Sequence, residues 1–255
     1  SSGKPAYGVG AGNATEFLDE TADIKATAMN GMLSKTSDFG SGCSADGNVL
    51  VPRSKYDAFM DALVEVGGYR ADADQRAALD KVMWDDESHR LADTVAISPQ
   101  KLAEAAGFTI PDEAKFIFVE GTGIGEEHNF CKEKLTTLMA IHAYDGSFED
   151  GVDLALELYE VGGKGHSCGI ASTDDEHIDY FGKMMPVSRI MVNQPNSRAN
   201  AGAFNNGMPM TSSMGCGTWG GNIISENVAL KHYMNTTWVS RKIAADRPSD
   251  AELFG

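Results

Sequence analysis

Cys43 is the residue of this chain whose neighbours best suit a nucleophile. It lies in a run of small residues, Gly40-Ser41-Gly42-Cys43-Ser44, which leaves room for a carbonyl compound to approach. A nucleophilic cysteine needs an accessible sulfur that ionises below the usual thiol pKa of about 8.5. Many cysteines are instead inert packing, and the local sequence leaves that interpretation of Cys43 open.

His166 is the second candidate. It follows the glycine turn Gly162-Gly163-Lys164-Gly165 and opens a predicted strand. From that place an imidazole can reach a pocket as an acid, a base or a hydrogen-bond donor. A hydrogen-bonded structural histidine is the alternative. The other histidines have no such local pattern.

Two runs of spaced glycines and three further cysteines carry weaker signals. Gly8-x-Gly10-x-Gly12 and Gly121-x-Gly123-x-Gly125 resemble phosphate-binding loops, but such runs also form tight turns. The four cysteines, at positions 43, 131, 168 and 216, form no C-x-x-C pair and match no zinc template. We therefore expect free thiols and no metal site.

Alternating helical and strand patterns predict an α/β fold around these residues. The expected helices cover residues 23–35, 55–66, 73–83, 98–107, 147–161, 175–184 and 225–233. The expected strands cover residues 49–52, 115–120, 135–144, 166–172, 187–193 and 235–244. The segment between residues 194 and 222 has no period, and so long an irregular stretch predicts a functional site.

Composition limits the partners. A net charge of −16 argues against nucleic acid, because neutralising phosphates needs clustered Lys and Arg. No apolar run approaches the roughly 18 residues of a membrane span. The opening residues lack the basic and apolar regions of a signal peptide, so we expect a cytosolic protein.

Six motifs, taken together and in this order, resemble the coenzyme A-acylating branch of the aldehyde dehydrogenase superfamily. They are GKPAYGVGAGN, LDETADIK, LSKTSDFGSGCSADGNVLV, CKEKLTTLMAIHAY, GGKGHS and GCGTWGGNIISENV. The resemblance implies the α/β catalytic domain of that fold over residues 36–222, preceded by the end of a nucleotide-binding domain at 1–35. Residues 223–255 are then a C-terminal helix, an oligomerisation strand and a tail. About as many residues again precede this region in a full member.

The resemblance also assigns roles. Cys43 matches the family's nucleophile and His166 the histidine of its GGxGH motif. Glu133 matches the acid that holds a ribose of the nicotinamide cofactor, NAD or NADP, since a carboxylate accepts hydrogen bonds from hydroxyls. Gly10 matches a glycine at which the backbone approaches the nicotinamide. Met214 falls in a cofactor-contacting loop.

One departure from the hydrolytic relatives predicts the acyl acceptor. Those enzymes carry a water-activating glutamate before the nucleophile, where this chain reads Tyr7-Gly8-Val9-Gly10-Ala11, without acid or base. Water attacks poorly without a general base, whereas a partly ionised thiol does not need one. The resemblance supplies coenzyme A as that thiol.

The segment GAFNNGMPMTSSMGCGTWGGN is most similar to that of the acylating sulfoacetaldehyde dehydrogenases, with acetaldehyde and succinate-semialdehyde enzymes as relatives. A small anionic aldehyde needs cationic or amide donors, and Arg198, Asn205 and Asn206 are the candidates. Two rival hypotheses remain. One is a non-catalytic assembly module that forms a homo-oligomer by adding the strand 235–244 to a neighbour. The other is a Rossmann-type reductase without a covalent step.

Overall fold

Short apolar strands form one parallel sheet at the centre of the computed structural model, which describes residues 6–255. Within that range the sheet has seven strands in the order β3-β4-β5-β2-β1-β6-β7, and every pairing is parallel. The expected α/β class is confirmed. The strands are β1 (Thr15–Leu18), β2 (Asn48–Pro52), β3 (Gly68–Arg70), β4 (Phe116–Glu120), β5 (Leu138–Tyr144), β6 (Cys168–Ala171) and β7 (Ile190–Val192).

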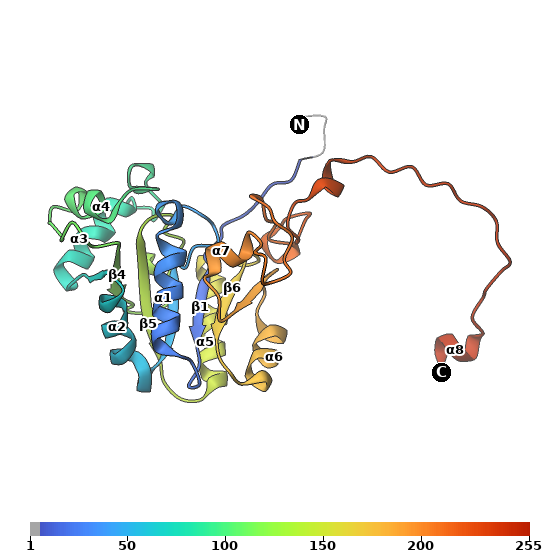
Figure 1. Cartoon of the computed structure of the whole chain (residues 1–255), viewed down its shortest axis with the longest axis horizontal. Helices are drawn as coiled ribbons and strands as arrows, with labels where there is room; N and C mark the ends of the chain where they lie inside the picture. Colours follow the sequence, from blue (N-terminus) through green and yellow to red (C-terminus); the bar gives the residue numbers. More distant parts are fainter. Residues whose placement is uncertain (1–5) are drawn as a thin grey trace.

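Helices cover both faces of this sheet (Figure 1). They are α1 (Ile24–Lys35), α2 (Tyr56–Glu65), α3 (Ala73–Met83), α4 (Pro99–Ala105), α5 (Phe148–Gly162), α6 (Asp175–Met184), α7 (Asn196–Asn200) and α8 (Asp250–Phe254). Side chains alternate between the faces along each strand: Leu18 packs with α1 and α2, whereas Phe17 packs with α5 and α6. A third cluster joins α3 and α4 to β4 and β5. No helix of the described residues is long and apolar enough to cross a membrane.

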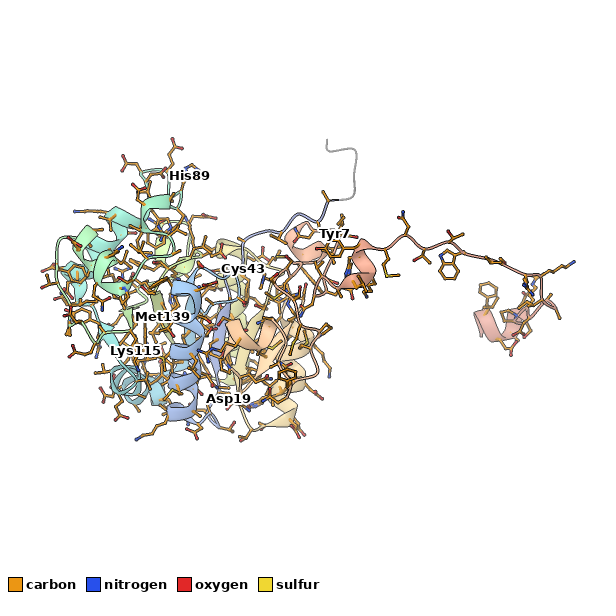
Figure 2. All side chains as sticks on the ribbon, turned by 45° about the horizontal axis from the view of Figure 1, so that its top comes forward. Tyr7, Asp19, Cys43, His89, Lys115 and Met139 are labelled. Atoms are coloured by element: carbon orange, nitrogen blue, oxygen red, sulfur yellow. The ribbon has the colours of Figure 1, made fainter. Side chains whose placement is uncertain are left out.

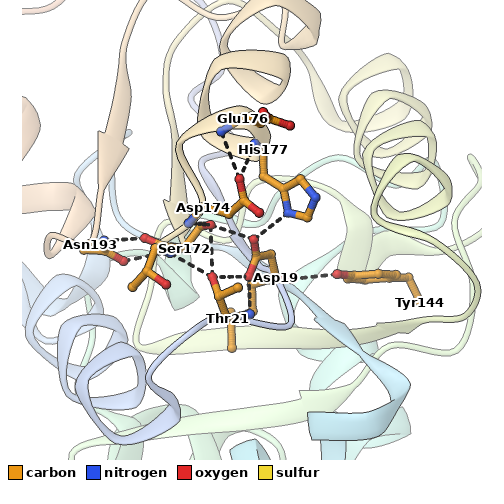
Figure 3. Close-up of polar contacts among 10 residues, drawn as sticks. Asp19, Thr21, Tyr144, Ser172, Asp174, Glu176, His177 and Asn193 are labelled. Carbon is orange, nitrogen blue, oxygen red and sulfur yellow. Dashed lines mark hydrogen bonds and ion pairs between the residues drawn. The ribbon is translucent and has the colours of Figure 1, made fainter.

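Asp19 anchors the edge of the sheet where the parallel strands end (Figure 3). Its buried carboxylate accepts hydrogen bonds from Ser172 Oγ and Thr21 Oγ1, each at 2.6 Å, and pairs with His177 Nδ1 at 2.8 Å. Burial alone would raise the pKa of Asp19, but these hydrogen bonds together lower it below its ordinary value. Both oxygens of the Asp19 carboxylate therefore have hydrogen-bond partners, and these bonds connect the loop after β1 with the loop after β6.

The sheet continues across the predicted domain boundary at residue 35. β1 lies in the middle of the sheet, paired with β2 on one side and β6 on the other. The boundary therefore does not coincide with a break in the sheet. Residues 1–5, with which the predicted segment 1–35 and the GKPAYGVGAGN motif begin, lie outside the described residues.

In the C-terminal region the expected helix was wrong, and the oligomerisation strand stays a prediction. The expected helix at 225–233 is only a short 3-10 turn at Leu230–Tyr233, because backbone hydrogen bonds from Gly215 to Glu226 and from Gly217 to Ile224 hold the beginning of this segment to another stretch of the chain. The expected strand at 235–244 has no regular structure and extends away from the sheet (Figure 1). A strand needs a neighbour for its backbone groups, and the described residues offer it none.

Candidate functional site

Cys43 and His166 meet at the edge of the sheet where the strands begin. Cys43 Sγ lies 2.9 Å from His166 Nε2, although 123 positions separate the two residues in the sequence. Cys43 precedes β2 and His166 precedes β6, and both strands pair with β1. The sulfur is therefore at the opposite edge from Asp19, as the two labels in Figure 2 show.

The turn that presents Cys43 depends on a left-handed glycine. Gly40 has φ 67°, and a Cβ at this position would lie 2.4 Å from the carbonyl oxygen of Thr136. Asp38 and Phe39 also have positive φ, so the chain reverses tightly after α1. Only a residue without Cβ fits at the third of these positions, which explains the glycine at position 40, three residues before Cys43.

The resting pair is a neutral thiol and a neutral imidazole. Burial, and then the charges of Glu133 and Cys216, raise the pKa of the Cys43 thiol. Burial, and then the nearby Arg189, lower the pKa of His166 to about 3. We assign the S–H as donor to Nε2 and Nδ1–H as donor to Ser167 Oγ at 2.8 Å, because that tautomer satisfies both contacts. The expected lowering of the Cys43 thiol pKa is wrong for this chain, because burial raises that pKa more than the positive charge of Arg189 lowers it.

Glu133 is connected to the loop that carries Cys43 by Gly12, which contacts both. Its Oε1 accepts a hydrogen bond from the backbone N–H of Gly12 at 2.8 Å. A Cβ on Gly12 would lie 1.9 Å from the carbonyl oxygen of Cys43 and 2.6 Å from Glu133 Oε1. The backbones before β1 and β2 are therefore in direct contact, with the carboxylate beside them. Burial raises the pKa of Glu133.

The Cys43 side chain lines a cavity of about 360 Å³. Met214, predicted for a cofactor-contacting loop, lies in the wall of the same cavity. The other lining residues are Tyr7, Val9, Ser212, Ser213, Ile224, Val228 and Tyr233. Gly10 lies behind this wall, where its carbonyl oxygen is 3.9 Å from Cys216 Sγ. A small molecule can therefore reach the sulfur between apolar side chains and the hydroxyl groups of serine and tyrosine residues.

Comparison with known proteins shows which enzymes this chain resembles. No protein-family model matches the sequence. A sulfoacetaldehyde dehydrogenase from Acholeplasma sp is 40% identical over 259 residues, which cover 100% of this chain and 53% of the relative. The acetylating succinate-semialdehyde dehydrogenase of Clostridium kluyveri is 36% identical over 256 residues, covering 100% of this chain and 56% of that enzyme. Along its whole length this chain is similar to about half of each of these acylating aldehyde dehydrogenases.

A solved structure agrees with that family. The acetylating aldehyde dehydrogenase from Geobacillus thermoglucosidasius superimposes with a TM-score of 0.87 at 32% identity, covering 96% of this chain and 54% of that one. The chain thus spans about half the length of the relatives it matches.

Three residues that were predicted to contact the substrate do not line the Cys43 cavity. Arg198 and Asn205 are exposed, and neither lines it. The Asn206 amide already serves the backbone: Nδ2 donates to Ala199 O at 2.9 Å, and Oδ1 accepts from Ala203 N at 3.0 Å. Their roles toward substrate stay predictions.

Two residues at the site were not predicted from the sequence. Arg189 is buried and donates to the carbonyl oxygen of His166 at 2.9 Å. Gly12 carries the contact between Cys43 and Glu133. The one signal for Arg189 was a full positive charge in the predicted strand VSRIMVN, since arginine is rarely buried without a partner.

Proposed function

We propose that this chain supplies the nucleophile for the oxidation of an aldehyde to an acyl-coenzyme A, with NAD or NADP as hydride acceptor. The observation that carries the proposal is the 2.9 Å contact between Cys43 Sγ and His166 Nε2 at the wall of an open cavity. Relatives with acylating names match along the whole of this chain, and this supports the reaction class.

His166 acts as a proton relay in the first step. As the Cys43 sulfur bonds to the aldehyde carbon, the thiol proton passes to Nε2 and then to the carbonyl oxygen, which gives a neutral thiohemiacetal. An imidazole with a pKa of about 3 returns a proton readily. Its Nδ1–H stays bonded to Ser167 Oγ and keeps the ring in the required orientation.

Glu133 fits the ribose of a nicotinamide cofactor. A carboxylate has about four acceptor sites, and the hydrogen bond from Gly12 uses one of them. The side chain is only partly buried, so further hydroxyl donors can reach it. When bound, the nicotinamide supplies the acceptor for the hydride that leaves the thiohemiacetal carbon. As the hydride leaves, the hydroxyl proton of the thiohemiacetal passes to water through His166 Nε2, and Cys43 then holds the acyl group as a thioester.

Coenzyme A completes the cycle by thioester exchange. The incoming thiol attacks the acyl carbon, the bond to Cys43 Sγ breaks, and the proton of the incoming thiol returns to Cys43 through His166. The thiol of coenzyme A is consumed in this step, and the thiol of Cys43 is regenerated. Residues 7–11, which carry no acid or base, offer water no activating group.

Sulfoacetaldehyde is the substrate that we favour. The 40% identity to a sulfoacetaldehyde dehydrogenase supports it, and the Ser212 and Ser213 hydroxyls at the cavity can donate hydrogen bonds to sulfonate oxygens. Acetaldehyde and succinate semialdehyde are the alternatives.

Acyl trapping tests the reaction and the substrate together. The natural protein that carries this sequence, at full length, is mixed with the cofactor and each aldehyde but without coenzyme A. We expect mass spectrometry to find the acyl group on the Cys43 peptide, most extensively with sulfoacetaldehyde, and coenzyme A to release it. An unlabelled Cys43 despite reduction of the cofactor would refute the covalent route, and equal labelling by the three aldehydes would refute the substrate.

We also propose that the C-terminal segment joins copies of this chain into a homo-oligomer. Trp238, Val239 and Ile243 are 92%, 82% and 80% exposed, and the backbone around them has no regular structure. Exposed apolar side chains on unpaired backbone favour strand addition to a neighbour. Native mass measurement should show that removing residues 235–255 lowers the subunit number. An unchanged subunit number would refute this role.

A further inference from the structure

Arg189 carries a buried charge without an acidic partner. The residue is 6% exposed and lies immediately before β7. Among residues 6–255 no carboxylate forms an ion pair with it. Burying an unpaired charge is costly, and features that break such a rule concentrate at functional sites.

The guanidinium binds four acceptors on four separate segments. Nη2 donates to the carbonyl oxygens of His166 at 2.9 Å and Gly215 at 2.7 Å. Nη1 donates to the carbonyl oxygen of Ser225 at 2.9 Å, and Nε donates to Asn200 Oδ1 at 3.2 Å. One planar group thereby joins the loop before β6, both extended segments behind the cavity, and α7.

Three of these four segments contribute directly to the site. His166 contacts the Cys43 sulfur through its imidazole while Arg189 holds its backbone. Gly215 follows Met214, and Ser225 follows Ile224, and both of those neighbours line the cavity. A shift of the guanidinium would therefore move the proton relay and the cavity wall together.

The charge of Arg189 also lies near the sulfur, because the guanidinium binds the backbone of His166, whose imidazole contacts Cys43 Sγ. The ionisable groups around Cys43 are His166, Glu133, Cys216 and Arg189. Glu133 and Cys216 oppose ionisation of the thiol, whereas Arg189 favours it. The same positive charge opposes protonation of His166. Arg189 is the only cation among these four groups in the described part of the chain when the imidazole is neutral.

We propose that Arg189 is the positioning residue of this site, fixing His166 against the cavity wall and supplying the positive charge that an ionised Cys43 sulfur faces. This role rests on the proposed function. Alkylation of Cys43 tests it without aldehyde, cofactor or coenzyme A, so a failure of either idea can be told from a failure of the other.

The experiment compares Arg189→Met and Arg189→Lys in the full-length protein. The rate of iodoacetamide labelling at Cys43 is followed against pH by peptide mass spectrometry. With Arg189→Met, the profile should move to higher pH, and the rate at pH 7.5 should fall about tenfold for each unit of displacement. With Arg189→Lys, the charge remains and the profile should stay in place. Its kcat should nevertheless fall about tenfold or more, because one ammonium cannot reproduce the planar fork.

Arg90→Met is the matched control. Arg90 also donates to several carbonyl oxygens, including those of Lys134 and Met83, but none of its hydrogen bonds reaches His166 or the cavity wall. Its loss should lower the melting temperature and leave the alkylation profile unchanged. A parental profile in Arg189→Met would overturn the charge role. If that variant does not fold, parental kcat in Arg189→Lys would overturn the positioning role.

Discussion

Replacing Cys43 by serine is expected to abolish acyl transfer while leaving the fold intact. The hydroxyl can replace the thiol in the hydrogen bond to His166 Nε2, now 2.9 Å long, so the cost in stability should be below about 1 kcal/mol. A serine hydroxyl beside an imidazole with a pKa of about 3 has no strong base to activate it. We expect turnover to fall about 10⁴-fold or more, measured as cofactor reduction with aldehyde and coenzyme A.

Cys131→Ser is the control for this substitution. Cys131 is a buried free thiol whose Sγ donates to the carbonyl oxygen of Gly123 at 3.1 Å, a bond that serine can also make. It does not line the Cys43 cavity, and its replacement should leave acyl trapping on Cys43 unchanged. An acyl group recovered from position 43 of Cys43→Ser at the parental rate would contradict the assignment of the nucleophile.

Gly12→Ala is expected to disable the site from a position that does not line the Cys43 cavity. The new Cβ would lie 1.9 Å from the carbonyl oxygen of Cys43 and 2.6 Å from Glu133 Oε1. The first of these clashes is with the backbone of Cys43, so the loop that carries Cys43 must itself shift. Overpacking of this kind costs about 1–3 kcal/mol, and a misplacement of about 1 Å costs about 100-fold in rate. Thermal melting and kcat, measured together, check both expectations.

Gly42→Ala provides the matched comparison, because Gly42 is adjacent to Cys43 yet a Cβ there meets nothing within 4 Å. Its effect on melting and on kcat should be much smaller than that of Gly12→Ala. Equal effects of the two substitutions would show that the Gly12 contact does not position the nucleophile. Parental behaviour of Gly12→Ala would show the same.

Local signals predicted the longer elements well. The expected helices 73–83 and 175–184 match α3 and α6 at both ends. Ser98 and Ser147 begin two of the expected helices, and they cap α4 and α5 because each hydroxyl accepts a backbone N–H of the first turn. Such signals lie within a few residues of each other, so a single sequence contains them.

Elements held by distant partners were missed. β1 and β3 have four and three residues and no distinctive periodicity, and β1 is a strand because β2 and β6 flank it. The same reason applies to the site. Cys43 and His166 were each predicted from their neighbours, whereas the roles of Gly12 and Arg189 depend on backbone oxygens of other segments. Any residue type supplies such an oxygen, so the acceptor leaves no mark in the sequence.

The order of the strands along the sequence also determines when, during synthesis, the Cys43 thiol can contact His166. β1 and Cys43 leave the ribosome well before β6, the second neighbour of β1, which ends at Ala171. Long-range pairings of this kind form slowly. A nascent chain that has not yet reached β6 has a half-paired central strand and a Cys43 without its imidazole. In the nascent chain Cys43 is therefore first a thiol without this partner, and it gains its contact with His166 only later in synthesis.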